Sequence, residues 1–276
     1  MKRYEGILIA SDLDGTFLDA KGNVVSRNVE AIRAFTSQGG LFTFATGRHH
    51  DHLPEAVPGV KNLVNMPVIV ANGSYLYDFS TERVLAEVFM EVDTSRRVLE
   101  YARANFPRVG FRVSTPQGYL TDGRTDKIKK FIDYSKKHRS YLVEVAPIES
   151  WMQRLWHKIV FLGTCEELDA LCAELKAEFG EDTFEYNKSS ATLFELQKKG
   201  CSKGSMLKVL QQSYEILTGH AIKTFGVGDY ENDLALLTAA DVAVCPSGSH
   251  PAVLRVSDMT LCSNDEGVIA DLIERL

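Results

Sequence analysis

Blocks of apolar residues alternate with amphipathic segments along the first third of the chain. An almost continuous apolar run at 7–10 precedes an amphipathic segment at 26–38, and further apolar runs follow at 41–45 and 68–71. Continuous apolar runs are typical of strands covered on both faces, and their alternation with helical segments indicates βαβ units. The first third therefore predicts a parallel sheet.

The last third of the chain repeats this rhythm. A helical pattern at 203–217 is followed by the strand IKTFGVG, the helical segment NDLALLTAA, the strands DVAVCP and DMTLC, and a terminal helix. Strands that alternate with helices in this way favour a parallel sheet again. We therefore expect both ends of the chain to build one α/β layer system.

The middle of the chain mixes short strands with longer helices. After a hairpin pattern, YLYDFSTERVLAE, the helices are predicted at 94–105, 126–138 and 166–178, and the strands near 109–113, 120, 141–145 and 156–162. This mixture predicts an α+β insert. We expect an α/β core formed by residues 1–88 and 198–276, and an inserted domain at 89–197.

Composition and charge exclude several classes of protein. The chain has 276 residues, 45% of them hydrophobic, and a formal charge of −6, which leaves no basic surface for nucleic acid or an anionic membrane. The first apolar run stops at Asp12, too early for a signal peptide, and no run is long enough to span a membrane. We therefore expect a cytoplasmic protein without nucleic-acid or membrane partners. Its five cysteines form no CxxC pair, which predicts reduced thiols packed as small hydrophobic side chains.

Two carboxylates follow the first predicted strand directly, in the motif Asp12-Leu13-Asp14-Gly15-Thr16. Ligands of open α/β sheets gather at the carboxyl ends of strands, so this position itself suggests a functional site. Carboxylates this close repel each other and need a shared proton or a cation, and Mg²⁺ favours carboxylate and carbonyl oxygens. Glycine permits a sharp turn, and Thr16 is placed to orient a carboxylate.

Three further motifs lie at predicted strand ends or helix starts and suit a phosphate ester. Thr46-Gly47-Arg48 offers a hydroxyl, a backbone N–H and a guanidinium, and Lys203 stands where a helix begins. The segment Gly228-Asp229-Tyr230-Glu231-Asn232-Asp233 adds carboxylates and an amide after a strand, although Asn232 or Asp233 could simply cap the next helix. Each motif alone is weak, and their joint presence carries the prediction.

These residues resemble the haloacid dehalogenase superfamily of phosphatases, and within it the Cof-type (class IIB) hydrolases. DLDGT at 12–16, ATGR at 45–48, Lys203 and GDYEND at 228–233 stand in the family's order, and the insert lies where this group carries its cap. The resemblance covers nearly the whole chain. It implies a Rossmann-like parallel-sheet core with an inserted α+β, C2-type cap domain that determines substrate specificity. The segment VCPSGSHPAV, where many Cof-type sequences have MGNA, departs from the pattern and leaves the fit of the substrate there open.

The resemblance also implies a role for each matched position. Asp12 would be the nucleophile that forms an aspartyl-phosphate, and Asp14 the general acid and base. Asp12, the backbone carbonyl of Asp14 and Asp229 would hold Mg²⁺. The groups that would bind the substrate's phosphate are Thr46, Gly47, Arg48, Lys203 and Asn232, with Thr16 and Asp233 in support. The expected reaction is Mg²⁺-dependent hydrolysis of small phosphate monoesters, such as sugar phosphates or related metabolites, by a monomer or small homo-oligomer.

Two other functions remain open at this point: a phosphomutase on the same site, and a silent phospho-ligand-binding regulatory module.

Two other groups of residues have competing interpretations. His49, His50 and His52 resemble a transition-metal cluster, but their spacing and position favour an exposed helix entry. Lys158, a charge beside apolar positions of the insert, is a candidate substrate contact, with packing as the alternative.

Overall fold

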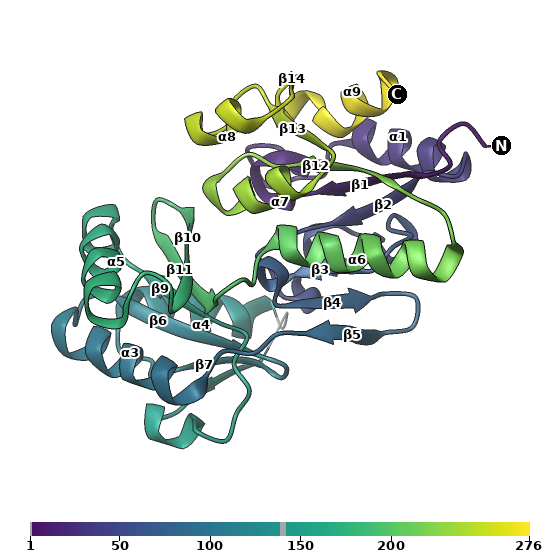
Figure 1. The fold of residues 1–276 in the computed structure, drawn as a ribbon. Coiled ribbons are helices and arrows are strands. Elements are labelled where there is room, and N and C mark those ends of the chain that lie inside the picture. Colours follow the sequence, from purple (N-terminus) through teal and green to yellow (C-terminus); the bar gives the residue numbers. More distant parts are fainter. Residues whose placement is uncertain (1, 139–141) are drawn as a thin grey trace. The chain divides into compact units, whose positions relative to one another are not determined.

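The computed structural model describes residues 2–138 and 142–276, and the chain divides into two compact units (Figure 1). One unit combines Met1–Glu87 with Ser202–Leu276, and the other is the continuous segment Val88–Cys201. The first unit therefore contains the two α/β ends of the chain, and the second contains the mixed pattern of its middle.

A five-stranded parallel sheet with the order β14-β13-β12-β1-β2 forms the centre of the first unit. Its strands are β1 (Ile7–Ser11), β2 (Leu41–Phe44), β12 (Lys223–Val227), β13 (Val242–Pro246) and β14 (Met259–Leu261). β1 lies between β12 and β2, and Ser11 at its end is level with Val227. The parallel sheet predicted from the two ends of the chain is confirmed, and the loops after β1 and β12 leave it side by side.

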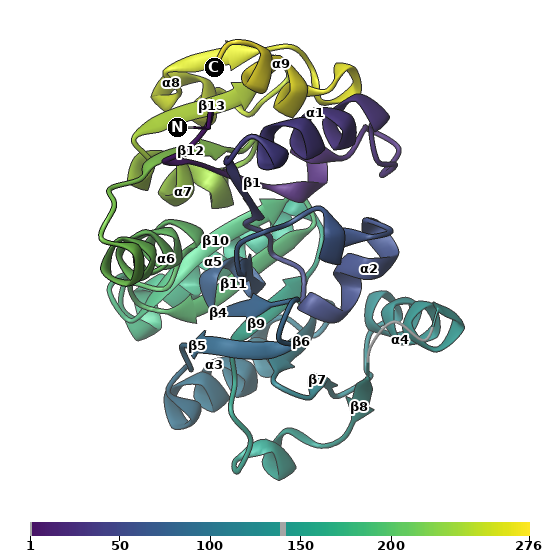
Figure 2. The same cartoon turned by 90° about the vertical axis from the view of Figure 1, so that its right-hand side faces the viewer.

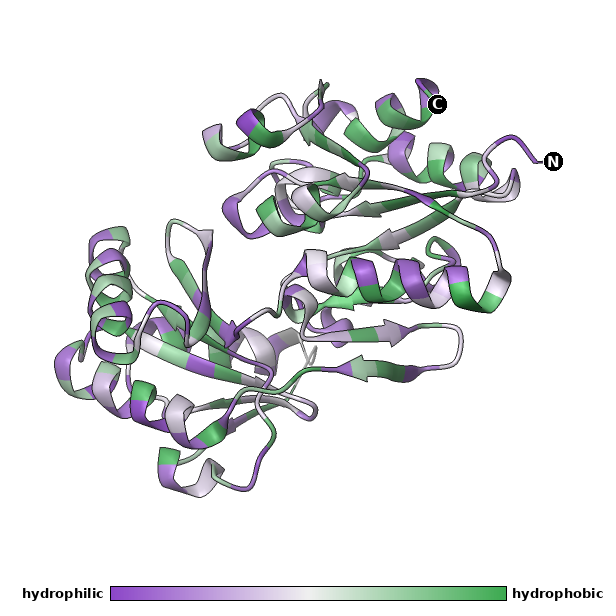
Figure 3. Cartoon of the chain, viewed as in Figure 1, coloured by the Kyte–Doolittle hydropathy of each residue, from purple (hydrophilic) through white to green (hydrophobic). Residues whose placement is uncertain are grey.

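Helices cover both faces of this sheet, as the continuous apolar runs of its strands require. Figure 2 shows α1 and α9 together on one face and α6 and α7 on the other, and Figure 3 shows β1 and β2 mainly hydrophobic while the helices alternate. The helices of this unit are α1 (Ser26–Ser37), α2 (Leu53–Ala56), α6 (Lys203–Thr218), α7 (Leu234–Ala239), α8 (Pro251–Val256) and α9 (Val268–Glu274).

The segment predicted at 68–71 forms a strand, but in a different sheet from the one expected. β3 (Val68–Val70) pairs antiparallel with β4 (Tyr75–Asp78), and β4 pairs with β5 (Arg83–Glu87). A single parallel bridge, Ala45 to Ile69, connects β3 to the chain after β2. The strand is only three residues long, and the turn that follows it reverses the chain before a longer parallel ladder can form.

The second unit contains a six-stranded mixed sheet with the order β10-β11-β9-β6-β7-β8. Its strands are β6 (Gly110–Thr115), β7 (Gly118–Thr121), β8 (Val143–Val145), β9 (Lys158–Leu162), β10 (Phe184–Ser190) and β11 (Leu193–Lys198). Its helices are α3 (Val92–Asn105), α4 (Asp126–His138) and α5 (Cys165–Phe179). The predicted α+β character is confirmed, and residue 141 of the predicted strand at 141–145 lies outside the described residues.

The hairpin of β10 and β11 was missed by the sequence analysis. β10 is the edge strand of its sheet and carries the polar run Glu185 to Ser190, so it lacks the apolar alternation that marks a half-buried strand. The connection through Ala191 and Thr192 contains neither Asn-Gly nor Asp-Gly, the strongest hairpin signals. The pairing of β11 with β9, and not local sequence, defines this hairpin.

Lys158 has a partner inside the insert. Its ammonium forms an ion pair of 2.5 Å with Glu195 of β11, and both side chains are buried. Charges removed from water must be paired. The structure therefore favours the packing interpretation of Lys158 over a substrate contact.

Within residues 2–138 and 142–276, no helix has both the length and the apolar character that crossing a membrane requires. All five cysteines are free thiols, and Cys201 and Cys245 are packed in the interior as expected, whereas Cys165 is exposed at the start of α5.

Candidate active site

Asp12 stands at the carboxyl end of the central strand. Its backbone N–H donates to the carbonyl of Val227 at 2.7 Å, which extends the pairing of β1 with β12 by one residue. The loop after β12 carries Asp229, so parallel pairing brings residues more than 200 positions apart in the chain to one edge of the sheet. Asp12 is itself buried there.

Lys203, the first residue of α6, places its ammonium between two carboxylates. Its Nζ donates to Oδ1 of Asp12 at 2.5 Å and to Oδ1 of Asp233 at 2.6 Å, and its side chain is fully buried. The helix begins there because the Ser202 hydroxyl accepts from the backbone N–H of Ser205 in a capping box. The cap of α6 therefore fixes where this buried cation enters the site.

Asp229 is held by the loop that follows β1. The Thr16 hydroxyl donates to its Oδ1 at 2.7 Å. Gly15 has a φ of +81°, and a Cβ there would lie 2.5 Å from Oδ2 of Asp229, so only glycine lets this backbone approach so closely. Asp233 accepts at Oδ2 from the backbone N–H groups of Asp229 and Tyr230, at 3.0 and 3.1 Å.

The charges in this cluster perturb one another. Burial raises the pKa of the Asp12 carboxyl well above its ordinary value, and Asp233 raises it further, against the opposing effect of Lys203. Burial and then Asp233 raise the pKa of Asp229 to about 6. Burial lowers the pKa of Lys203, but the charges of Asp12 and Asp233 outweigh burial and raise it overall. Negative charge is thus crowded beyond what one ammonium neutralises.

This donor set fits a hard divalent cation. Asp12, Asp229 and Asp233 each offer a carboxylate oxygen, and these atoms lie within 4.8 Å of one another. Mg²⁺ binds oxygen ligands, and a divalent charge relieves the repulsion that raises the two pKa values. Among the described residues, the carboxylate of Asp14 is not one of the oxygens in this group. Asp14 would therefore bind the cation through its backbone carbonyl.

Asp14 faces Arg48 instead. The guanidinium donates from Nε to Oδ2 at 2.9 Å and from Nη2 to Oδ1 at 2.6 Å. This two-pronged pair is partly exposed, so both groups can exchange partners with a solute. The Thr46 hydroxyl accepts from the backbone N–H of Arg48 at 3.2 Å, and Thr46 is buried at the end of β2.

Asn72 belongs to the site and was not identified from the sequence. Its Oδ1 accepts from Nδ2 of Asn232 at 3.3 Å, and a Cβ on Gly47 would lie 3.0 Å from the same oxygen. It has a φ of 55° in the turn Ala71–Gly73 after β3. The signal available was the Asn-Gly pair directly after an apolar run, a pattern that also marks ordinary turns.

The segment VCPSGSHPAV, which differs from the common pattern of Cof-type sequences, also contacts the site. It contains the end of β13 and the start of α8, and the backbone N–H of His250 donates to the carbonyl of Asp229 at 2.8 Å. Its sequence differs from the common pattern, yet its backbone supports the loop that holds Asp229.

Known proteins resemble this chain over nearly its whole length. The profile of the haloacid dehalogenase-like hydrolases matches residues 9–273. The 5-amino-6-(5-phospho-D-ribitylamino)uracil phosphatase YwtE of Bacillus subtilis is 24% identical, with 97% of each chain covered. The pyridoxal phosphate phosphatase YbhA of Escherichia coli is 24% identical, with 96% of this chain and 97% of the relative covered.

Solved structures show the same fold. A structure described as the HAD subclass IIB sugar phosphatase BT4131 matches with a TM-score of 0.81 at 18% identity, and 98% of each chain is covered. The α/β core with an α+β insert is thus a known architecture, and the expected resemblance and enzyme class are confirmed. The chain belongs to the haloacid dehalogenase-like hydrolase family.

Proposed function

We propose that this hydrolase is a Mg²⁺-dependent phosphatase that cleaves small phosphate monoesters through an aspartyl-phosphate. The observation that carries the proposal is the cluster at the end of β1, where Asp12, Asp229 and Asp233 converge and the buried ammonium of Lys203 pairs with Asp12 and Asp233. A nucleophilic carboxylate, a cation site and a fixed positive charge are what transfer of a phosphoryl group requires. Phosphatase relatives of nearly the same length support it.

Asp12 is the proposed nucleophile. An oxygen of its carboxylate attacks phosphorus, the bond from phosphorus to the ester oxygen breaks, and the phosphoryl group is transferred to Asp12. Lys203, which already contacts Asp12 Oδ1 at 2.5 Å, favours the ionised form of that carboxylate against the effect of burial and orients it. Asp233 in turn holds the ammonium in place.

Asp14 is the proposed acid and base. It gives a proton to the departing ester oxygen, and it then takes a proton from the water that attacks the aspartyl-phosphate. Arg48 pairs with Asp14 when no substrate is bound, and its guanidinium suits phosphate oxygens equally well. We expect Arg48 to release Asp14 on binding substrate, which lets Asp14 take up the proton that it must donate.

Asp12 and Asp229, with the backbone carbonyl of Asp14, would hold Mg²⁺, which supplies positive charge beside the transferring phosphoryl group. Thr46, Gly47 and Asn232 bind phosphate oxygens in this proposal, and Thr16 keeps Asp229 oriented. Asn72 extends the set, because its contact with Asn232 positions that amide.

The unit Val88–Cys201 is the proposed specificity domain. It is a continuous insert with its own sheet and core, so its sequence can vary without disturbing the catalytic cluster. The relatives are named for a ribitylamino-uracil phosphate and for pyridoxal phosphate, and a structural neighbour is named a sugar phosphatase. We therefore propose phosphorylated sugars, polyols and vitamin-like metabolites as the substrate class.

The test is release of inorganic phosphate from a panel of phosphorylated sugars, polyols, nucleotides and cofactors, with Mg²⁺ or with EDTA. We expect turnover with Mg²⁺ and none with EDTA. Conversion of a sugar phosphate into its isomer without phosphate release would identify a phosphomutase instead. Binding of the panel compounds without turnover in either condition would identify a silent binding module.

A further inference from the structure

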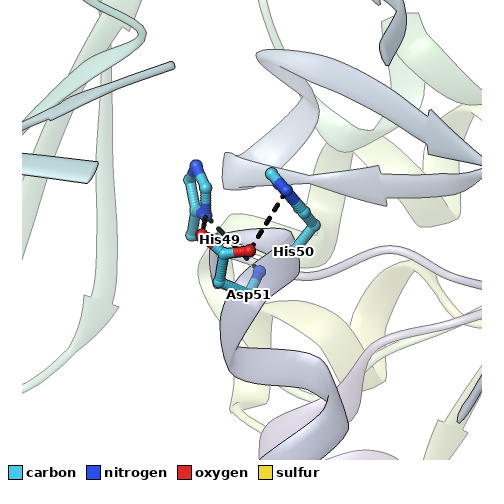
Figure 4. Close-up of side chains that lie close together, drawn as sticks. All are labelled: His49, His50 and Asp51. Carbon is cyan, nitrogen blue, oxygen red and sulfur yellow. Dashed lines mark hydrogen bonds and ion pairs between the residues drawn. The ribbon is translucent and has the colours of Figure 1, made fainter. Parts of the chain in front are cut away.

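Two histidines and an aspartate converge directly after Arg48, in a segment with no role in the proposed reaction. Nδ1 of His49 lies 3.3 Å from Oδ2 of Asp51, and Nε2 of His50 lies 3.3 Å from Oδ1 of the same carboxylate (Figure 4). One ligand atom from each residue lies within 4.8 Å of the other two. The expected helix entry is confirmed, because His49 caps the short helix His50–His52, but the expected exposure is wrong for His49, which is buried, and His50 is partly buried.

These spacings match the edges of a small coordination polyhedron. Zinc binds imidazole nitrogen and carboxylate oxygen at about 2.0–2.2 Å, so neighbouring ligand atoms of a tetrahedral site lie about 3.4 Å apart. The two nitrogen–oxygen separations here are both 3.3 Å. The two nitrogens face different oxygens of Asp51, so one ion would bind either or both of these oxygens together with the two imidazoles. Nδ1 of His49 now accepts from the backbone N–H of Asp51 at 3.4 Å and would exchange this hydrogen bond for the ion.

The second ring nitrogen of His50 has a hydrogen-bond partner, as is usual for metal-binding histidines. Its Nδ1 lies 2.9 Å from the hydroxyl of Tyr75, a buried residue of β4, and its ring stacks on Tyr77 with centroids 3.9 Å apart. These contacts fix the ring plane and leave Nε2 directed at Asp51 (Figure 4).

We propose that His49, His50 and Asp51 form a second metal site, which binds a borderline transition-metal ion such as Zn²⁺ or Co²⁺. Imidazole nitrogen favours such ions over Mg²⁺, whereas the cluster of Asp12, Asp229 and Asp233 offers only oxygen. The site follows Arg48 directly in the chain, so an ion held there fixes the segment that carries the partner of Asp14. It does not depend on which substrate the enzyme hydrolyses.

The test is titration of the tag-free protein with Co²⁺ in excess Mg²⁺, which keeps the carboxylate cluster occupied. Visible absorption reports Co²⁺ bound to nitrogen ligands in a low-coordinate site, and Zn²⁺ should displace it. We expect one Co²⁺ per chain, and His50→Gln and Asp51→Asn should each weaken binding at least tenfold. Tyr75→Phe, which removes only the supporting hydroxyl, should weaken it about 10–100-fold.

Two control variants make the result decisive. His220→Ala removes an exposed histidine outside the cluster and should leave Co²⁺ binding unchanged, and so should Asp229→Asn, which alters the oxygen cluster. Far-UV circular dichroism confirms that each variant is folded. No bound Co²⁺, or unchanged binding in folded His50→Gln and Asp51→Asn, would overturn the proposal. Loss of binding in Asp229→Asn alone would assign the ion to the carboxylate cluster and overturn it equally.

Discussion

At the scale of single residues, the ammonium of Lys203 explains how Asp12 and Asp233 can be buried so close together. Two carboxylates without a cation would be strongly destabilising in this interior position, and the ammonium contacts both at 2.5 and 2.6 Å. The neighbouring Asp14 has a different environment, since it is exposed and paired with Arg48. The two aspartates of one motif are thus prepared for different chemistry.

This difference predicts different defects for two matched variants. Asp12→Asn removes the attacking oxygen, so no phosphoenzyme should form with any ester. Asp14→Asn keeps the proposed nucleophile but loses the proposed proton donor, and the help of such a donor is typically worth about 10²–10⁴-fold. Phosphorylation should therefore slow greatly for a sugar phosphate and little for an aryl phosphate, whose phenolate leaves unaided.

Rapid-quench single turnovers of both variants with both kinds of ester measure the phosphate transferred to protein. Equal slowing of aryl and alkyl esters in Asp14→Asn would contradict its role as the acid. A phosphorylated Asp12→Asn protein would contradict the assignment of the nucleophile.

Asp229 gives a prediction about pH and stability. Its pKa in the fold is about 6, above the value of about 4 for an unfolded chain. The folded, metal-free protein therefore binds more protons between these pH values, and its stability falls as pH rises from about 4 to about 6. Above pH 6 the loss is complete. Asp229→Asn lacks this loss. In EDTA, its Tm should therefore rise relative to that of the wild type as pH increases from about 4 to about 6.

Asp19 provides a control of opposite sign. Hydrogen bonds from Asn23 lower its pKa, so Asp19 contributes stability that is present above about pH 4 and lost as pH falls below it. Asp19→Asn should therefore lose Tm relative to the wild type as pH rises toward about 4, and should show little further relative change between about pH 4 and about pH 6. Parallel shifts in the two variants would refute the assigned environment of Asp229.

Most residues of the candidate site could be predicted from the sequence because they follow strands or begin helices. Several polar residues grouped at such positions are seldom needed for folding alone. Asp12, Lys203 and Asp229 were found in this way, and the structure brings them into one cluster. Asn72 escaped because an Asn-Gly turn after a strand is common. The burial of His49 escaped because it depends on packing around the side chain that no local pattern records.

At the scale of elements, the turn after β3 determines how closely α6 can approach the site. Gly73 has a φ of +90°, and a Cβ there would lie 2.0 Å from the carbonyl oxygen of Ser202. Ser202 caps α6 directly before Lys203. The tight fit of this turn against the helix start therefore controls the position of the ammonium.

Gly73→Ala should displace the start of α6 and lower both stability and kcat. Gly59→Ala is the matched control, because Gly59 also has a positive φ, +81°, but a Cβ there would have no atom within 4 Å. The control should lose about 1 kcal/mol from backbone strain alone, whereas the clash at Gly73 should add about 1–3 kcal/mol. Urea unfolding and steady-state kinetics measure both effects, and equal losses with normal kcat in both variants would exclude this role for the turn.

Helices with a strong periodic pattern were predicted well. Strands whose place depends on pairing with a distant strand were not. α1, α3 and α6 were found within a few residues because each has an apolar stripe and clear end signals. The polar edge strand β10 was missed, and β3 was assigned to the wrong sheet. Local sequence indicates that a segment is extended, but long-range pairing decides which strand it joins.

At the scale of the whole molecule, the insert has the features of an independent folding unit. Its own core contains Trp156, Phe161, Leu171 and Phe194, all fully buried. We expect the isolated fragment 88–201 to fold and to unfold cooperatively on heating, with near-UV circular dichroism from its packed tryptophans. The fragment 88–183, which lacks β10 and β11, should not fold, because it leaves the edge of β9 unpaired and the core open. A disordered 88–201 fragment would contradict this view of the insert.

The position of β1 between β2 and β12 also has a consequence for synthesis of the protein on the ribosome. β2 follows β1 early, but about 180 further residues must be translated before β12 can pair, which takes on the order of 10–40 s at about 5–20 residues per second. Over most of that interval Asp12 has neither Lys203 nor Asp229 beside it, and the insert, which ends at Cys201, is complete before β12 and Asp229 are translated. The nascent chain therefore acquires its proposed specificity domain before its proposed catalytic centre, and a stop codon between those for Cys201 and Asp229 should yield a folded insert attached to an inactive core.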